Sequence, residues 1–508
     1  MATQFLLANS ALFMIDGLMN VVRLCRKKSK TTAFDRRKTR MNELPVMELN
    51  DLIDGQKVRI RAVIFLFMAA LALVADGYDL SAIGYVGPEL VKSWHIVPAM
   101  LAPVFSAGIF GLLFGAPVLG SIGDRIGRKK IILIGLCTFG CITLLTMAAS
   151  SLAQFMVLRF ITGVGLGGVI PNVGALASEL SPKRLRGMFI VIVNFGVPVG
   201  IILPGFVAAC LVPHFGWPIL LFVGGILPIA VAIIAFYFLP ESIKYLAERG
   251  DRPGELRKIA HLLRPELPIS EKTQFVTLAA SSAVARGSSK TLFTSGLAII
   301  TPLIWIVLAT NQMSNFFSLS WLPMLLQSTG SNTSQAGISV SLFSIGGLSS
   351  GFILLLIIDR LGVVPLVILF FFGTPLIAAI GMPGLTLTEH RMIIAGAGFC
   401  VKGINFGTAA IVGMIYPTSV RSMAAGWAQA AGRVGALAAP IVGGVLLEMH
   451  FSMQDLMFAP AFVMSVGTVT CATLAILCAR RFDGFGLSES SAASTMALCV
   501  APSIHSKI

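Results

Sequence analysis

The amino-acid sequence predicts an all-α membrane protein with twelve transmembrane helices in two halves of six. Of its 508 residues, 56% are hydrophobic and only 12% are charged, whereas a soluble domain is about 25% charged. The apolar residues stand in long runs without the alternation of a transmembrane barrel. Twelve spans of roughly 20 residues fit within the chain. This composition excludes a soluble enzyme and a disordered protein, because a soluble surface needs more charge and a disordered chain fewer apolar residues.

A hydrophilic stretch near the middle of the chain divides the predicted spans into two sets of six. We expect an N-terminal tail, a first six-helix bundle, a central loop, a second six-helix bundle and a C-terminal tail over 1–61, 62–239, 240–295, 296–479 and 480–508. The apolar stretch 5–22 also contains Asn9, Asp16 and Asn20. We favour a tail at the membrane surface for it over a thirteenth span, and Met41 is an alternative start.

The positive charges predict the orientation of the chain. Its net charge is +15, and Lys and Arg gather in the N-terminal tail, in the turns at 125–130 and 183–186, and in the central loop. The loops on the other side carry little beyond Lys92 and Arg391. Cytoplasmic loops are rich in Lys and Arg, so we expect both termini in the cytoplasm. The charge is therefore a topology signal, and no nucleic-acid partner is expected.

The most specific motif, GSIGDRIGRKK, follows the second predicted span. Gly120 is expected to let two helix ends approach closely, and Gly127 permits a tight turn. Asp124 can pair with an arginine or face a helix N-terminus. The basic residues, Arg125 and Arg128 among them, hold the loop at the cytoplasmic surface.

A shorter copy of this motif, DRLG at 359–362, stands at the equivalent place in the second half but lacks the basic pair. Such internal repeats build many transporter folds, in which the substrate site lies between the repeats near the membrane midplane.

Ionisable residues inside the first and fourth spans indicate an ion or proton path. Asp76 and Asp79 share one helical face, and each carboxylate inside a span costs roughly 2.5–3.5 kcal/mol. In the alternative, the span is shorter and Asp79 lies among the outer headgroups. Arg159 lies at a similar depth, so we expect it to neutralise Asp76 or Asp79. Glu179 can pair with the basic turn at 183–186 or with the loop motif.

The second half places two cations near the midplane, Lys402 and Arg433, with Asn405 close to the first in sequence. Two cations at that depth indicate a binding site for a carboxylate. If the carboxylate belongs to a molecule with an aromatic ring, Trp321, Phe406 and Trp427 are the side chains expected to stack on it. The polar residues of the seventh span either line the cavity or form interhelical hydrogen bonds; they include Asn311, Gln312, Asn315, Ser318 and Ser320.

These motifs together resemble those of the aromatic acid:proton symporters, a family of the major facilitator superfamily. The loop motif matches the superfamily pattern Gly-x-x-x-Asp-Arg-x-Gly-Arg-Lys, and DGYDLSAIGYVGPEL resembles the family's Asp-Gly-Phe-Asp segment, with Tyr78 in place of Phe. Similar segments stand in the fourth, seventh and eleventh spans, and the resemblance covers roughly Asp51 to Arg481. It implies the major facilitator fold and proton-driven uptake of a benzoate-like acid such as 4-hydroxybenzoate.

The resemblance implies proton coupling by Asp76 and Asp79, and functional roles for Arg159 and Arg433. The predicted gating set is Gly120, Asp124, Arg125, Gly127, Arg128, Glu179 and Arg421. The resemblance implies functional roles for Asp124, Arg128, Glu179 and Arg421, and the loop motif itself indicates the other three. The predicted substrate-binding set is Arg159, Arg433, Lys402, Asn405 and Trp321. Lys402 is a charge not expected in this family, so it puts the exact substrate in question.

We therefore expect a proton-coupled symporter of the inner (cytoplasmic) membrane that works by alternating access on an aromatic acid. The alternative is a major facilitator carrier for another organic anion or a sugar-like solute, and PESIKYL at 240–246 resembles a sugar-carrier motif. A receptor without flux is a further alternative. An enzyme, a metal or a cofactor is not expected, because the 6 histidines form no nucleophile–base or metal set.

Overall fold

The structure is a computed structural model of the chain. It describes residues 46–56, 60–182, 184–250, 252–264, 266, 273–276, 292–293, 297–416 and 420–481. The chain divides into two compact units, Met1–Val46 and Met47–Ile508, and the account below concerns the second. The stretch 5–22 and the tail from 482 onward lie outside the described residues.

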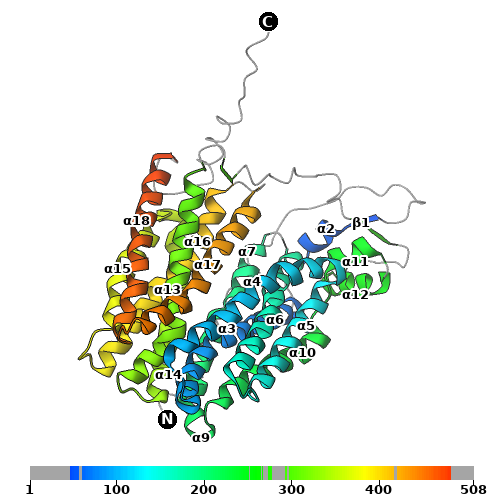
Figure 1. Cartoon of the computed structure of the whole chain (residues 1–508). Coiled ribbons are helices and arrows are strands. Elements are labelled where there is room, and N and C mark those ends of the chain that lie inside the picture. The colour runs from blue at the N-terminus through cyan, green and yellow to red at the C-terminus, as the bar shows by residue number, and fades with distance from the viewer. Residues whose placement is uncertain are drawn as a thin grey trace. The chain divides into compact units, whose positions relative to one another are not determined.

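The first bundle consists of six membrane-length segments (Figure 1). They are α3 (Ile60–Trp94), α4 (Leu101–Ile126), α5 (Arg128–Thr146), α6 (Leu152–Glu179), α7 and α8 (Arg186–Asn194 and Gly196–Cys210), and α10 (Pro218–Phe238). The fifth segment is interrupted at Phe195, between α7 and α8. Two short helices, η1 (Pro98–Met100) and α9 (Val212–Phe215), lie in the connections.

The second bundle also has six long helices. They are α13 (Ile300–Ser328), α14 (Thr333–Leu361), α15 (Val364–Ile380), α16 (Leu387–Ile415), α17 (Arg421–Glu448) and, after η4 (Asp455–Met457), α18 (Phe458–Arg481). Ten helices among the described residues are long and apolar enough to cross a membrane. The other two are α15, which is apolar but only 17 residues long, and α13, which is long enough but too polar. The predicted all-α fold of twelve helices is confirmed.

The hydrophilic stretch between the bundles contains regular structure that composition did not predict. It forms α11 (Ile243–Arg249), α12 (Pro253–Leu263) and β2 (Gln274–Val276), which pairs with β1 (Val46–Glu48) beside α2 (Leu49–Asp54). Leu49, Leu52 and Leu246 are buried in one apolar cluster with the first bundle. The start of this stretch is therefore packed on the helix ends.

Helices α4 and α6 pack closely because glycines stand where the two backbones meet. A Cβ at Gly163 would collide with the carbonyl oxygen of Gly108. The prediction that Gly120 serves this purpose is wrong, since a Cβ there would meet Pro171 at an ordinary 3.7 Å. The close approach lies at Gly123 instead, where a Cβ would collide with the side chain of Asn172.

Candidate functional site

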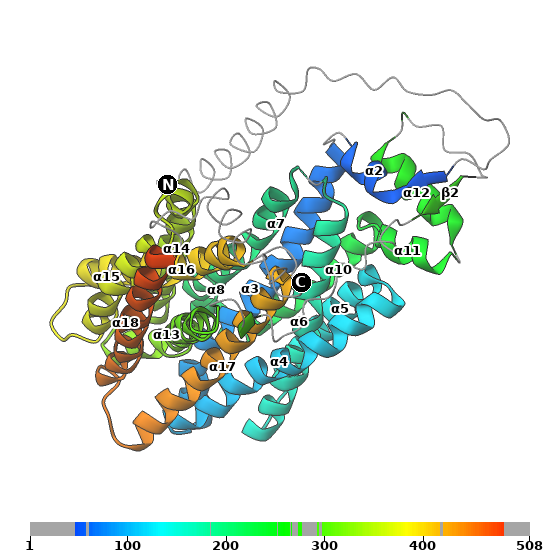
Figure 2. The ribbon, with the colours of Figure 1, turned by 90° about the horizontal axis from the view of Figure 1, so that it is seen from above.

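The two ends of the bundles are distinguished by their polar contacts. We call the end where α4 ends and α5 begins the Arg128 end, and the opposite end, where α3 ends, the Glu89 end. The two bundles meet along α3 with α13, α4 with α17, and α8 with α14. Figure 2, which is seen from above relative to Figure 1, shows α17 next to α4. Residues that face these three contacts lie between the two halves.

A buried ion pair joins α3 to α6. Arg159 Nη1 and Nη2 donate to the two carboxylate oxygens of Asp79, each at 2.7 Å, and both side chains are about 95% buried. Such fork-to-fork geometry is the strongest arrangement that an arginine and a carboxylate form. Of the two aspartates offered by the sequence, Asp79 is thus the partner of Arg159. A burial this complete also places Asp79 inside the protein.

Asp76, one turn earlier on α3, has no such partner. It is completely buried, and neither carboxylate oxygen accepts a hydrogen bond in the described part of the chain. The charged group that acts on it from the second bundle is Arg433 of α17, although the two form no ion pair. A buried carboxyl group without donors is costly when ionised. The two aspartates therefore differ: Asp79 is bound to Arg159, whereas Asp76 has no hydrogen-bond donor among the described residues.

Lys402 of α16 lies at the interface with α14 and forms no hydrogen bond or ion pair with any described residue. It is buried, its aliphatic chain packs on Gly347, and its Nζ lies 5.7 Å from the ring centroid of Phe343. This cation–π contact compensates part of the cost of burying the charge. Lys402 is therefore held by its own half, and the structure places it beside Asn405 without joining the two side chains.

Asn405 instead contacts α13. Its Nδ2 donates to Gln312 Oε1 at 2.7 Å, and both side chains are partly exposed. From the Arg128 end, Gln312 and Arg433 each stand about 18 Å along their helices, and Asn405 about 15 Å. With Asp76 and Lys402, these residues form a central polar layer, which is the name used below.

An aromatic cluster lies next to this layer, toward the Arg128 end. Phe195 of the first half stacks on Phe352 with ring centroids 5.1 Å apart, and it contacts Phe406 at 5.8 Å. Trp321 and Trp427, which were expected to stack on a substrate ring, contact other aromatic side chains of the protein instead. Trp321 is fully buried with its ring edge against Phe105, and Trp427 stacks on another tryptophan, Trp305. In this conformation Phe406 is the member of the three that stands beside the polar layer.

The polar residues of α13 divide between the two interpretations offered by the sequence. Ser314 forms an interhelical hydrogen bond with the carbonyl oxygen of Pro460, and Ser318 bonds within its own helix. Asn311 is buried with both amide atoms unpaired among the described residues, and Asn315 has an unpaired oxygen. Of these residues, Gln312 is the one whose side chain forms a partly exposed hydrogen bond with another helix in the described part of the chain.

At the Arg128 end, a network of charges fixes the loop between α4 and α5. Arg128 pairs with Asp124 and Glu179, each at 3.1 Å. Glu179 also accepts a hydrogen bond from Ser242 Oγ at 2.5 Å, so it joins the loop motif to the start of the central stretch. Glu241 accepts from the backbone N–H groups of Lys129 and Ser242. The PESIKYL segment is thus part of this network, which sequence reasoning missed because it lies far from the loop.

Replacing Arg128 by glutamine is expected to lower the transport rate at least tenfold. Glu179 is about 94% buried and would lose its cation, which is costly for a buried charge. The matched control is Asp124→Asn, because that side chain is 68% exposed and exposed pairs contribute little. Initial uptake rates of both variants check this, and an Arg128→Gln protein that transports at the wild-type rate would show that Glu179 does not need Arg128.

The remaining gating residues have simpler surroundings. Gly127 adopts φ 111°, and a Cβ there would collide with the Glu241 carboxylate, so the glycine is required. Arg125 is exposed, and Arg421 donates from Nε to the carbonyl oxygen of Tyr416 at 3.2 Å. The side chain of Asp359, in the second copy of the motif, lies outside the described part of the chain.

At the Glu89 end the two halves are hydrogen-bonded to each other. Lys92 Nζ donates to Glu89 and to Gln327 Oε1, at 3.2 and 2.9 Å, and Thr333 donates to Glu89 at 3.0 Å. A Cβ at Gly84 would collide with the carbonyl oxygen of Leu319. The halves are therefore in close contact at this end, and this closure was not predicted from the sequence.

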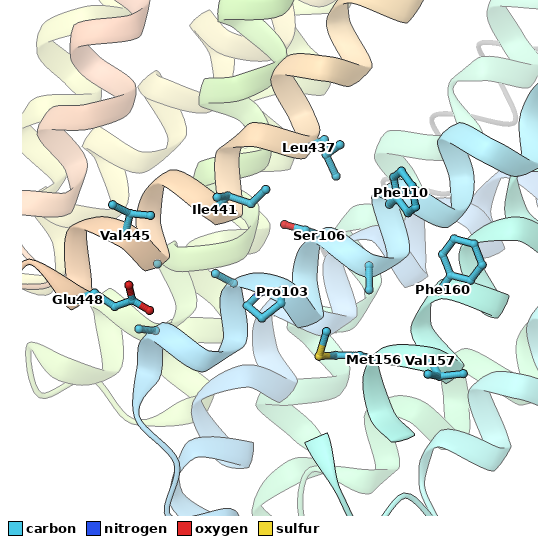
Figure 3. Close-up of a pocket in the computed structure, with 14 residues that line it drawn as sticks. Pro103, Ser106, Phe110, Met156, Val157, Phe160, Leu437, Ile441, Val445 and Glu448 are labelled. Atoms are coloured by element: carbon cyan, nitrogen blue, oxygen red, sulfur yellow. The ribbon is translucent and has the colours of Figure 1, made fainter. Parts of the chain in front are cut away.

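A cavity of about 660 Å³ lies between α4 and α17 near the Glu89 end (Figure 3). Its lining is almost entirely apolar; the polar side chains are Ser106, whose buried hydroxyl is unpaired, and Glu448. It contains no cation, so it is separate from the central polar layer and does not suit a carboxylate.

Two helical bundles with buried charges between them define a membrane transporter, and comparisons with known proteins agree. Residues 69–409 and 304–495 match the family model of the Major Facilitator Superfamily. The chain is 30% identical over 403 residues to the 4-hydroxybenzoate transporter PcaK of Pseudomonas putida, covering 78% of this chain and 90% of that protein. It is also 30% identical over 424 residues to the gallate transporter of Pseudomonas putida, covering 83% and 94%.

Among solved structures, the fold is similar to that of a bacterial homologue of the human lysosomal transporter Spinster. The TM-score is 0.63 at 14% identity, covering 83% of this chain and 98% of that one. The chain belongs to the major facilitator superfamily and, within it, to the family of these aromatic acid transporters. It is a transporter and not an enzyme.

Proposed function

We propose that this protein is a symporter that carries an aromatic carboxylic acid, of the 4-hydroxybenzoate type, together with a proton. The relatives named for 4-hydroxybenzoate and gallate support the substrate class. The observation that carries the coupling is the completely buried carboxyl group of Asp76, to which no described residue donates a hydrogen bond. Arg433 is the cation of the other half whose charge bears on it. We further propose import across the inner membrane, with the Arg128 end and both termini in the cytoplasm.

Substrate and proton are coupled because Asp76 and the substrate carboxylate compete for the charge of Arg433. When the site is empty, Arg433 is available to an ionised Asp76, and the two charges cancel. When a substrate carboxylate binds Arg433, Asp76 loses that compensation, and taking up a proton keeps the buried site neutral. Substrate and proton therefore favour each other's binding, which is a coupling free energy between two sites. Asp79 stays bound to Arg159 and holds α3 in register with α6.

The conformation fits one stage of an alternating-access cycle. The halves are joined at the Glu89 end by Lys92 and Thr333, so we propose that this outer end is closed here. Release then occurs toward the Arg128 end, past the Phe195–Phe352 contact. The network at Arg128 is proposed to break and re-form as the halves rock.

The proposed function is tested by uptake of labelled aromatic and dicarboxylic acids into proteoliposomes, with and without an uncoupler. We expect at least one benzoate-type acid to accumulate above its external concentration and to lose that accumulation when the uncoupler is added. Accumulation that is insensitive to the uncoupler would contradict proton coupling. Transport of other solutes alone would favour the alternative, a carrier for a different organic anion or a sugar-like solute.

A further inference from the structure

The hydrogen bond between Gln312 and Asn405 leaves part of each amide unused. An amide group has one oxygen that accepts and two N–H groups that donate. The bond uses Gln312 Oε1 and one N–H of Asn405, and neither side chain makes another hydrogen bond with a described residue. A carbonyl oxygen on one amide and an NH₂ group on the other therefore remain. Exchanging O and N in both amides would leave the same combination.

These unused atoms are accessible, unlike those of the neighbouring amide. Asn311 is completely buried, and its amide oxygen and nitrogen are enclosed without partners. Gln312 and Asn405 are only partly buried, and none of their amide atoms is enclosed in this way. A donor and an acceptor are thus presented side by side in the central polar layer.

The amide pair stands next to Arg433 and Phe406, the residues that would hold the carboxylate and the ring of an aromatic acid. A Cβ at Gly432 would lie 3.1 Å from Gln312 Cγ, so Gln312 packs on α17 at the residue before Arg433. Phe406 follows Asn405 directly on α16, and its ring contacts Phe195. Arg433 and Phe406 are thus the residues that directly follow Gly432, on which Gln312 packs, and Asn405 along their helices.

We propose that the Gln312–Asn405 pair recognises a hydroxyl group on the ring of the substrate and so selects hydroxylated aromatic acids over unsubstituted ones. The inference rests on the proposed function and adds its specificity. The phenolic O–H donates to the free amide oxygen, and the free NH₂ group donates to the phenolic oxygen. A site built to bond a hydroxyl rejects a ligand that lacks it, by about tenfold or more for one such contact.

The experiment compares kcat/KM for benzoate, 3-hydroxybenzoate and 4-hydroxybenzoate in proteoliposomes. The variants are Gln312→Met and Asn405→Leu, which keep side-chain size but remove the polar atoms. Benzoate transport by the same variants is the internal measure of folding and of the carboxylate contact. Thr408→Val is the matched control, because the hydrogen bond that the Thr408 hydroxyl forms in the described part of the chain lies within α16, to the carbonyl oxygen of Ile404 at 2.7 Å.

The wild-type protein is expected to prefer one hydroxybenzoate to benzoate by about tenfold or more. Both variants are expected to bring that ratio close to one, while Thr408→Val preserves it. A ratio unchanged in both variants, or a wild-type protein that carries all three acids equally, would overturn the specificity and leave the proposed function standing. Transport of none of the three would overturn both.

Discussion

Replacing Asp76 by asparagine is expected to abolish accumulation against a gradient, so that the internal substrate concentration rises no higher than the external one. Asparagine is similar in size to aspartate but cannot take up or release a proton. Asp76 forms no hydrogen bond with a described residue, so the substitution leaves none of these residues without a partner. The site would then bind the substrate at Arg433 without a proton, and the two halves would still rock.

Two measurements separate loss of coupling from loss of transport. Uptake driven by a proton gradient reports the first, and counterflow of labelled against unlabelled substrate reports the second. Gradient-driven uptake is expected to disappear while counterflow persists. The matched control, Asp455→Asn, changes an exposed aspartate at the Glu89 end whose hydrogen-bond partner among the described residues is Ser452. An Asp76→Asn protein that still concentrates substrate would remove Asp76 from the coupling.

Replacing Arg159 by glutamine is expected to have the largest effect on stability. Asp79 would be left about 96% buried without its cation, and removing one partner of a buried pair costs about 3–5 kcal/mol. We expect a lower unfolding temperature in detergent and a loss of transport. Arg252→Gln is the control, because Arg252 is partly exposed and lies 3.6 Å from Glu255, and such pairs contribute about 0–1 kcal/mol.

The double variant Asp79→Asn, Arg159→Gln distinguishes structure from function in this pair. Both charges are absent, so no buried charge is left unpaired, and the unfolding temperature is expected to recover in part. Transport is expected to stay low if Asp79 also helps to move the proton, as the sequence predicts. Full recovery of coupled transport would restrict the Asp79–Arg159 pair to holding α3 against α6.

For the first half, the sequence predicted which charged residues are buried but not which of them form ion pairs with each other. Asp76 and Asp79 lie on one face of α3, so spacing alone left both as partners for Arg159. The side-chain contacts of α6 with α3 decide for Asp79. Glu179 likewise had two possible partners, and the choice of Arg128 depends on where the loop folds back.

For the second half, the sequence predicted how deep the two cations lie in the membrane but not the direction in which each side chain points. Lys402 and Arg433 stand at similar levels, yet Lys402 turns toward Phe343 on α14, because Gly347 leaves room for its chain. A periodic pattern could not show this, since α16 is apolar or small on most of its surface. Gln312 was one polar residue among several until its contact with Asn405 singled it out.

The interruption of the fifth segment at Phe195 and the helices of the central stretch were also missed. The break falls within residues 194–198, where a glycine and a proline are a local signal inside the apolar run. The amphipathic α11 is short and gains its stability by packing on the first bundle. Its formation depends on contacts between segments distant in sequence, which composition and spacing do not contain.

The coupling of substrate to protons is tested most directly by following protons themselves. In weakly buffered proteoliposomes without an imposed gradient, addition of the preferred aromatic acid is expected to draw protons inward through the wild-type protein, so the external pH rises as the substrate enters. The Asp76→Asn protein is expected to admit substrate with no such rise. Substrate entry through the wild-type protein without proton movement, or proton movement that survives the substitution, would contradict the account.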